Sequence, residues 1–515
     1  MTVIDTPSGR IHGTTALTRR ADVQCYLGIP FAASPVGRLR FQPPAPVEPW
    51  KGVLKAKRHG MAAPQNSDPV MERGGYYQPP SGEDGCLNLN VWTARADGAK
   101  RPVMVWIHGG AYVTGSNATG NNSGAELAAT FDVVVVSINY RLGALGFLYL
   151  ADRFGDEFGD SGNLAILDQL AALAWVRDNI AAFGGDPDDV TVFGESAGGA
   201  AVGTLLGTPR AEGLFRRAIV QSGTAERARS TADSAAVTDQ FLEALGEPDI
   251  GARALQELPL ARILAAQHEL ASVFAATVVG LPLPFQPVID GRVLPRLPLE
   301  SIRAGVNSTV DLLAGTNLNE ASFFTELRPE GAVDPLTVAQ KLEILARADF
   351  DGDESLPERY AATLASVLGR TPTENQVLES YLSDQLYRQP TNRLLDARAG
   401  SAGDNYAYLF AWPSPLLDGR LGSCHALDVP FVFRQLHRIE SVSLVGDDAP
   451  QSLSDAMSAA WVRFADQGAP ASASLPHWPT YEASDRSTMI LDLDARVEND
   501  PRAQLRRLWA ARVPV

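Results

Sequence analysis

The sequence predicts an α/β fold with a central, mostly parallel sheet flanked by helices, and three observations support this prediction. Short apolar runs recur along the chain and are continuous rather than alternating, as in strands buried on both faces of a parallel sheet. Helix-like stretches lie between several of these runs. Hydrophobic residues make up 45% of the 515 residues, which is enough for a large core. The clearest strand-like runs are Val103–Ile107, Val133–Ile138, Val190–Phe193, Ala218–Val220, Asp311–Ala314 and Tyr406–Phe410.

The clearest helix-like stretch runs from Asn163 to Phe183. We expect Asn163 to cap its start, and Gly184, Gly185 and Pro187 to end it. Apolar residues recur in this stretch at helical spacing, namely Leu164, Leu167, Leu170, Ala171, Ala174 and Ile180.

Two further segments, at about 225–305 and 325–400, also have a helical composition. We interpret them as insertions over the carboxyl-terminal edge of the sheet, where open α/β sheets bind ligands. No linker or internal repeat interrupts the chain. We therefore expect a single domain over residues 1–515, with these two segments as cap regions.

The composition also limits the partners and the location. A net charge of -16 at pH 7 argues against nucleic acid and anionic membranes, which select basic patches. No apolar stretch is long enough to span a bilayer, and no leader segment is visible, so we expect a cytoplasmic protein. The three cysteines, Cys25, Cys86 and Cys424, are expected to be reduced. The oligomeric state stays open, with a monomer slightly favoured.

A candidate nucleophile lies in the motif Gly-Glu-Ser-Ala-Gly at residues 194–198. A strand-like run comes immediately before it and a stretch rich in small residues follows, from Ala197 to about Leu206. This order of strand, sharp turn and helix raises the hydroxyl of Ser196 above the sheet. The structural alternative is an ordinary glycine-rich turn, which the rest of the pattern disfavours.

The segment from Trp106 to Tyr112 follows another strand-like run and contains the pair Gly109 and Gly110. Glycines allow main-chain N–H groups to point toward a ligand, and a tetrahedral intermediate needs such donors at its oxygen. The N–H group of Ala197 would be a further donor. A glycine-rich turn without a ligand is the alternative.

A serine nucleophile needs a base and an acid. His425 lies in a loop after a strand-like run, where the base is expected. Glu320 directly follows the run Asp311–Ala314 and could orient the imidazole, although other carboxylates between Ser196 and His425 also qualify. Among the other histidines, His12 and His59 precede the nucleophile, and His108 lies in the oxyanion loop. His268 and His437 lie in helix-like stretches, and His477 has a structural context.

Taken together, these segments resemble the type-B carboxylesterase/cholinesterase family. The resemblance implies an α/β-hydrolase fold, a Ser196–Glu320–His425 triad, and oxyanion donors at Gly110, Ala111 and Ala197. It also implies that Arg141 and Asp168 form a buried structural ion pair. Further matching segments are 28–32, 40–41, 83–91, 139–143, 167–169, 183–187, 193–199, 221–223 and 287–291.

The sequence departs from the family pattern around the substrate site. Secreted members join the cysteine matching Cys86 to one just before a Pro-Gln pair, but here that place reads Ala62-Ala63-Pro64-Gln65. Residues 66–80 hold no tryptophan for a quaternary ammonium, only Tyr76 and Tyr77, so choline esters are not expected. Leu281 and Leu283 align with acyl-pocket positions and suggest an apolar pocket for a modest acyl group.

We therefore predict a carboxylesterase that acts on small-molecule esters through an acyl-enzyme. No metal or cofactor is expected, because no metal-ligand or phosphate-loop motif is present. Two alternatives remain open at this point. One is a carbamate or amide hydrolase of the same family, and the other is a catalytically inactive binding protein.

Overall fold

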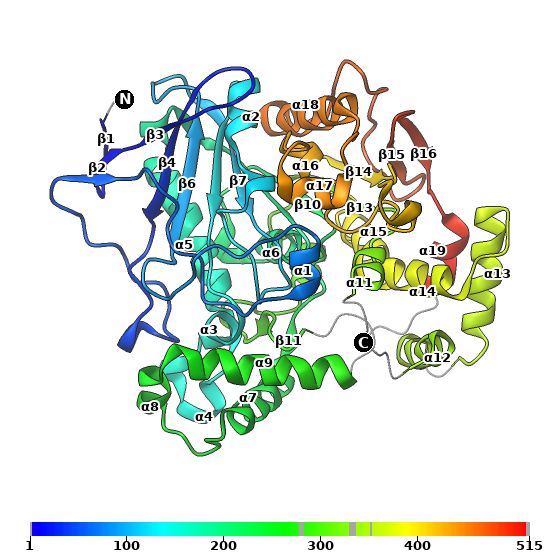
Figure 1. Cartoon of the computed structure of the whole chain (residues 1–515), viewed down its shortest axis with the longest axis horizontal. Helices are drawn as coiled ribbons and strands as arrows, with labels where there is room; N and C mark the ends of the chain where they lie inside the picture. The colour runs from blue at the N-terminus through cyan, green and yellow to red at the C-terminus, as the bar shows by residue number, and fades with distance from the viewer. Residues whose placement is uncertain (1–2, 278–282, 329–335, 351–352, 511–515) are drawn as a thin grey trace.

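The central element of the structure is a twisted sheet with helices on both sides (Figure 1). The computed structural model describes residues 3–277, 283–328, 336–350 and 353–510. Within these residues the sheet has eleven strands in the order β16-β15-β14-β13-β10-β9-β7-β8-β6-β4-β3. The strands are β3 (Thr14–Ala16), β4 (Val23–Pro30), β6 (Asn88–Thr93), β7 (Arg101–Ile107), β8 (Val134–Ile138), β9 (Gly185–Glu195), β10 (Arg217–Gln221), β13 (Asp311–Asn317), β14 (Asn405–Phe410), β15 (Ser487–Leu491) and β16 (Arg496–Asn499).

The strands from β15 to β8 pair in parallel, and antiparallel pairing is confined to the two ends of the sheet. This confirms the predicted mostly parallel sheet, and each of the six predicted runs lies almost entirely within a strand. In the centre, Gly194 pairs with Ile107 on one side and Val220 on the other. The strands β7, β9 and β10 therefore end together at one edge of the sheet, where the candidate site lies.

Side chains alternate between two hydrophobic cores, one on each face of the sheet. On β7, Val103 and Val105 belong to the core that includes α5 (Leu164–Asn179) and α6 (Ala197–Leu206). Met104 and Trp106 belong to the core on the opposite face, with α2 (Ala125–Thr130) and α18 (Gln451–Gln467). Burial on both faces explains why the strand sequences are continuously apolar.

The helix α5 begins at Leu164, but the predicted cap does not form. The side chain of Asn163 instead donates to the Val288 carbonyl oxygen at 2.7 Å and accepts from the Val288 N–H at 3.0 Å. That prediction was wrong because Asn163 bonds to a residue far along the chain rather than to its own helix. At the other end, a short 3-10 turn ends at Gly184, which adopts a left-handed conformation as expected.

Helices fill both segments that the sequence marks as insertions. The first contains α7 (Thr231–Leu245), α8 (Ala252–Glu257) and α9 (Leu260–Thr277), which gather along the lower side in Figure 1. The second contains α12 (Val338–Asp349), α13 (Leu356–Leu368), α14 (Glu374–Ser383), a π-helical turn (Asp384–Arg388) and α15 (Gln389–Ala397).

The helix α9 reaches the carboxyl-terminal edge of the sheet. The side-chain oxygen of Gln267 accepts from the N–H of Ala144, in the short helix α3 (Gly143–Phe147) that follows β8. The side-chain amide of Gln267 also donates to Asn66, and Asn66 donates to the carbonyl oxygen of Leu264. The loop after Ala62 is thus attached to α9.

Arg141 and Asp168 form the ion pair that the family resemblance implies. Two guanidinium nitrogens of Arg141 lie 2.7 and 2.8 Å from the carboxylate oxygens of Asp168, and both side chains are buried. The main-chain N–H of Arg141 donates to the same carboxylate. Because every polar group of the pair has a close partner, the pair fixes the loop after β8 against α5.

The three cysteines are all free and buried. Burial raises the pKa of Cys86 to about 12, so its thiol stays protonated and unreactive. The loop near it closes without a disulfide, because the N–H of Ala62 donates to the carbonyl oxygen of Pro80 and the N–H of Gly82 donates to the carbonyl oxygen of Ala62.

None of the described helices combines the length and the apolar composition that a bilayer-spanning segment needs.

Candidate active site

Ser196 occupies the sharp turn between β9 and α6. Its φ of 58° and ψ of -122° form a strained conformation that L-residues rarely adopt. The N–H of Ser196 donates to the carbonyl oxygen of Gln221 at 3.0 Å, which holds the turn against β10. The predicted order of strand, turn and helix is therefore present, with α6 ending at Leu206.

The glycines that flank Ser196 allow the strand and the helix to approach closely. A Cβ atom at Gly198 would overlap the carbonyl oxygen of Ile107, and one at Gly194 would lie 2.6 Å from the main chain of Gly198. Both contacts are shorter than packed atoms allow. The motif therefore needs glycine at both positions to place Ser196 at the edge of the sheet.

His425 and Glu320 lie next to each other although 105 residues separate them. The Nδ1 atom of His425 is 2.6 Å from Oε2 of Glu320, and both side chains are buried. The other oxygen of Glu320 accepts from the hydroxyl of Ser222 at 2.5 Å and from the N–H of Asn317 at 2.7 Å. These bonds fix the carboxylate, which in turn fixes the plane and the tautomer of the imidazole.

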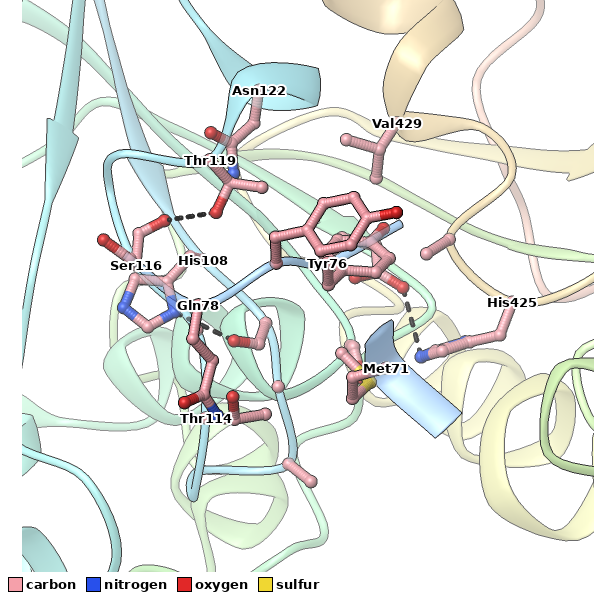
Figure 2. A pocket seen from close by; sticks show the side chains of 18 of the residues that line it. Met71, Tyr76, Gln78, His108, Thr114, Ser116, Thr119, Asn122, His425 and Val429 are labelled. Carbon is pink, nitrogen blue, oxygen red and sulfur yellow. Dashed lines mark hydrogen bonds and ion pairs between the residues drawn. The ribbon is translucent and has the colours of Figure 1, made fainter. Parts of the chain in front are cut away.

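Ser196 and His425 line the same cavity, but among the described residues no hydrogen bond joins their side chains. The Nε2 atom of His425 instead lies 3.1 Å from Oε1 of Glu195 (Figure 2). Burial raises the pKa of Glu195, and the positive charge of protonated His425 acts in the opposite direction by stabilising the Glu195 carboxylate. Glu195 and His425 are therefore electrostatically coupled, so a change at one alters the protonation of the other.

Replacing Glu195 with glutamine should move the acidic limb of the kcat/KM profile to lower pH. Burial lowers the pKa of His425, but the carboxylates of Glu195 and Glu320 outweigh this effect and raise it overall. Removal of one carboxylate makes the imidazolium less stable, so the imidazole remains a neutral base at lower pH. Rates measured across the titration range of histidine test this, and an unchanged acidic limb would contradict it.

The segment after β7 forms a loop that presents main-chain N–H groups. Gly110, Ala111 and Tyr112 have φ values of 110°, 54° and 62°, an unusual series for residues with side chains. Gly110 and Ala111 line the cavity beside Ser196. Within the described part of the chain, the N–H groups of Gly110, Ala111 and Ala197 donate to no other group, as an oxyanion site requires.

Gln65 supports this strained loop through its side-chain amide. Its side-chain oxygen accepts from the hydroxyl of Thr114 at 2.7 Å and from the N–H of Gly115 at 2.9 Å. Its side-chain amide donates to the carbonyl oxygens of Gly115 and Ala63, at 2.9 and 3.0 Å. These four hydrogen bonds join the buried side chain of Gln65 either to residues 114 and 115 of the loop or to Ala63. Gln65 therefore helps to position the main-chain N–H donors.

Replacing Gln65 with alanine should lower kcat about 10- to 100-fold while KM changes little, because a small displacement of the loop misplaces donors that act mainly in the transition state. Steady-state kinetics on a short ester measure both parameters. Gln78→Ala is the matched control, since Gln78 lines the same cavity but bonds to Asn66 rather than to the loop. Equal losses in the two variants would contradict this role for Gln65.

His108, at the start of the loop, is a neutral support. Its ring stacks on Tyr140 with centroids 4.5 Å apart, and its Nδ1 lies 2.8 Å from the carbonyl oxygen of Gly109. Burial lowers the pKa of His108 to about 4, so the imidazole is uncharged at neutral pH. Of the remaining histidines, His268 lies in α9, whereas His437 lies in a turn rather than in the expected helix.

The cavity at Ser196 is mostly apolar and is bounded by the loop of residues 65–79 (Figure 2). Tyr76 and Tyr77 line it, as do residues from four other parts of the chain. Leu283 is buried outside this cavity, and its carbonyl oxygen accepts from Arg229 at 2.8 Å. Leu281 lies outside the described residues. Further lining side chains are Met71, Trp106, Phe323, Phe324 and Val429.

Among the described residues, no group of three or more histidine, cysteine, aspartate or glutamate side chains is arranged to hold a metal ion.

Glu195 and Gln65 were not predicted from the sequence to take part in the site. Glu195 carried a signal, because a carboxylate at the carboxyl end of a buried strand points to the site edge. Gln65 carried none, since its partners lie 49 and 50 residues away.

Comparisons with known proteins place this chain in a family. The family model described as "Carboxylesterase family" matches residues 1–509. The chain is 35% identical to a para-nitrobenzyl esterase of Bacillus subtilis, with 98% of each chain covered. It is also 35% identical to a phenmedipham hydrolase of Pseudarthrobacter oxydans, with 92% of this chain and 93% of the relative covered. The crystal structure of a Geobacillus stearothermophilus carboxylesterase superimposes with a TM-score of 0.86 at 37% identity, covering 99% and 100% of the two chains.

Proposed function

We propose, from the premise that the chain belongs to the carboxylesterase family, that Ser196, His425 and Glu320 carry out its hydrolysis of carboxylic esters. The observation that carries this proposal is the 2.6 Å contact between Glu320 and His425, at a cavity that Ser196 also lines. A nucleophile, a base and a group that orients the base are the minimum set for acyl transfer.

In the first half of the reaction, the hydroxyl of Ser196 attacks the ester carbonyl carbon and His425 accepts the hydroxyl proton at Nε2. This requires a small rotation of either side chain, because Nε2 faces Glu195 in the structure. Glu320 stabilises the imidazolium without accepting its proton. The C–O bond of the ester then breaks, and His425 returns the proton to the departing alcohol.

In the second half, His425 removes a proton from water, which attacks the acyl-enzyme and releases the carboxylic acid and free Ser196. Both tetrahedral intermediates carry a negatively charged oxygen. The N–H groups of Gly110, Ala111 and Ala197, which have no partner among the residues described, would bind it, with added support from the amino end of α6. The loss of one such donor typically costs about 3–4 kcal/mol of transition-state stabilisation.

An active-site label tests the assignment of Ser196. A fluorophosphonate should modify one residue per chain, and peptide mass spectrometry should locate the phosphonyl group on Ser196. His425→Gln should react far more slowly, because the serine loses its base. A label on another serine, or an undiminished labelling rate in His425→Gln, would refute the triad.

The same machinery serves carbamate and amide bonds, so these remain the alternative physiological substrates. The comparison of matched ester, carbamate and amide substrates by kcat/KM separates them. We also propose that the whole chain forms one domain, acts as a monomer and works in the cytoplasm. Its three unpaired, buried cysteines support a reducing compartment, and sedimentation velocity measures the oligomeric state.

A further inference from the structure

We propose that Tyr387 is a positioning residue for the catalytic base, whose aromatic ring both holds the imidazole of His425 in place and stabilises its charged form. This inference rests on the proposed role of His425 and adds a residue outside the triad. The observation that carries it is the contact between the two rings, whose centroids lie 4.6 Å apart at an interplanar angle of 39°. Tyr387 is only 3% exposed, so this contact is shielded from water.

The imidazole of His425 needs a support that still allows it to turn. Its Nδ1 atom lies 2.6 Å from Glu320, whereas its Nε2 atom lies 3.1 Å from Glu195 and must reach Ser196 during the reaction. A further hydrogen bond to the ring would oppose this movement. Dispersion contacts with an aromatic ring have no preferred direction, so Tyr387 can restrict the place of the imidazole and still permit the rotation.

The π-helical turn that carries this tyrosine is bonded to both sides of the loop of residues 318–321, which contains the acid of the proposed triad. On one side, the guanidinium of Arg388 donates to the carbonyl oxygen of Leu318 at 2.7 Å. On the other side, the hydroxyl of Ser383 accepts from the N–H of Ala321 at 3.0 Å. The turn therefore keeps a fixed position relative to the carboxylate that orients the base.

The π-helical conformation explains how one turn makes both contacts. The N–H of Gln389 donates to the carbonyl oxygen of Asp384, five residues earlier, which is the repeat of a π-helix. Ser383 and Arg388 are also five residues apart, so this repeat brings them to the same side. In an α-helix, side chains five residues apart point about 140° apart, and one of the two bonds would be lost. Short π-helical turns often occur at functional sites.

Two phenylalanines of α11 (Ser322–Glu326) also pack near the imidazole of His425. The ring centroids of Phe324 and Phe323 lie 5.4 and 6.1 Å from that of the imidazole. Both phenylalanines line the cavity at Ser196 and can contact a substrate there, whereas Tyr387 does not line it. We therefore expect Tyr387 to affect kcat rather than KM.

The ring of Tyr387 also lies where it can stabilise the imidazolium. His425 becomes positively charged during the reaction, and a cation within about 6 Å of an aromatic centroid is attracted to the face of the ring. Burial lowers the pKa of His425. Three carboxylates outweigh this effect, namely those of Glu195, Glu320 and Asp428. Burial raises the pKa of Tyr387 itself, so its phenol stays neutral and adds no charge of its own.

The hydroxyl of Tyr387 is not needed for this role. It is buried and has no hydrogen-bond partner among the described residues. Because a buried hydroxyl without a partner is unfavourable, its removal should not destabilise the fold. The contributions of the ring and of the hydroxyl can therefore be separated by substitution.

The test compares Tyr387→Leu, which removes the ring, with Tyr387→Phe, which keeps it. In Tyr387→Leu, kcat for p-nitrophenyl butyrate should fall about 10- to 100-fold with little change in KM, because the base is misplaced. Tyr387→Phe should keep nearly wild-type kcat. Tyr406→Leu is the matched control, since Tyr406 is also buried but packs against Phe464, away from the site. Equal losses in Tyr387→Leu and in either of the other variants would overturn the proposal.

A second measurement keeps the shape of the ring, in case Tyr387→Leu does not fold. Phenylalanines with one, two or three fluorine atoms at position 387 progressively weaken the negative face of the ring. A less stabilised imidazolium releases its proton at lower pH, so the acidic limb of the kcat/KM profile should move stepwise to lower pH relative to Tyr387→Phe. We expect a shift of about half a pH unit for the most fluorinated ring. An acidic limb at the same pH across the series would overturn the proposal.

His425→Gln distinguishes the failure of this role from the failure of the proposed function. If His425→Gln keeps wild-type kcat, then His425 is not the base and the proposed function fails. If His425→Gln is inactive but every variant at position 387 matches the wild type, then only the positioning role of Tyr387 fails.

Discussion

Replacement of Ser196 by alanine should reduce kcat for short esters by about 10⁶-fold, which is the loss typical of a removed serine nucleophile. The strained turn keeps the side chain at position 196 beside the cavity, and alanine fits the same backbone without adding atoms. The residual rate would come from the oxyanion donors and substrate binding alone. Hydrolysis of p-nitrophenyl esters of increasing chain length measures this loss and also gives the preferred acyl length.

Ser116→Ala is the matched control for this experiment. Ser116 lines the same cavity, and its hydroxyl accepts from the nearby N–H of Ala118 and from no other group that the structure describes. We expect this variant to keep nearly full activity. Comparable activity in Ser196→Ala and the wild type would show that another group attacks the ester. Melting temperatures of both variants would show whether either substitution perturbs the fold.

The second large effect is expected for Glu320→Gln, with a loss in kcat of about 10⁴-fold. The side-chain oxygen of glutamine can still accept from Ser222 and from the N–H of Asn317. Its amide nitrogen then faces Nδ1 of His425 and donates to it, which places the imidazole proton on Nε2. A histidine in that tautomer cannot accept the proton of Ser196.

Steady-state rates on p-nitrophenyl butyrate measure the effect of Glu320→Gln, and Glu326→Gln provides the control. Glu326 lies in the short helix after Glu320 and pairs with Arg420. A loss below tenfold in Glu320→Gln would mean that Glu320 does not orient the base. Near-wild-type melting temperatures in both variants would show that the effect is catalytic.

The central strands could be predicted because each is buried on both faces. In β8, all five residues are buried, so the apolar run coincides with the strand. The edges of the sheet were not foreseen. In β16, no residue is fully buried, so the sequence there does not differ from that of a loop. Asn163 shows a related limit, because the choice between a helix cap and a distant partner depends on tertiary contacts.

The residues of the proposed triad could be predicted from the sequence more readily than the residues around them. Ser196 has a local motif, and His425 and Glu320 each follow a strand, so chain order and loop position are informative. Gln65 has no such pattern. Its proposed role depends on hydrogen bonds to a segment 49 or more residues away, which become visible only when the chain is folded.

The loop bounded by Ala62 and Gly82 has a consequence for the production of this protein. Main-chain hydrogen bonds at its base, and bonds from Asn66 to Gln78 and α9, hold one wall of the substrate cavity. Maturation of that wall therefore requires neither an oxidant nor a disulfide isomerase. The protein should reach full activity directly from an ordinary bacterial expression host, and reducing agents in storage or reaction buffers should leave that activity intact.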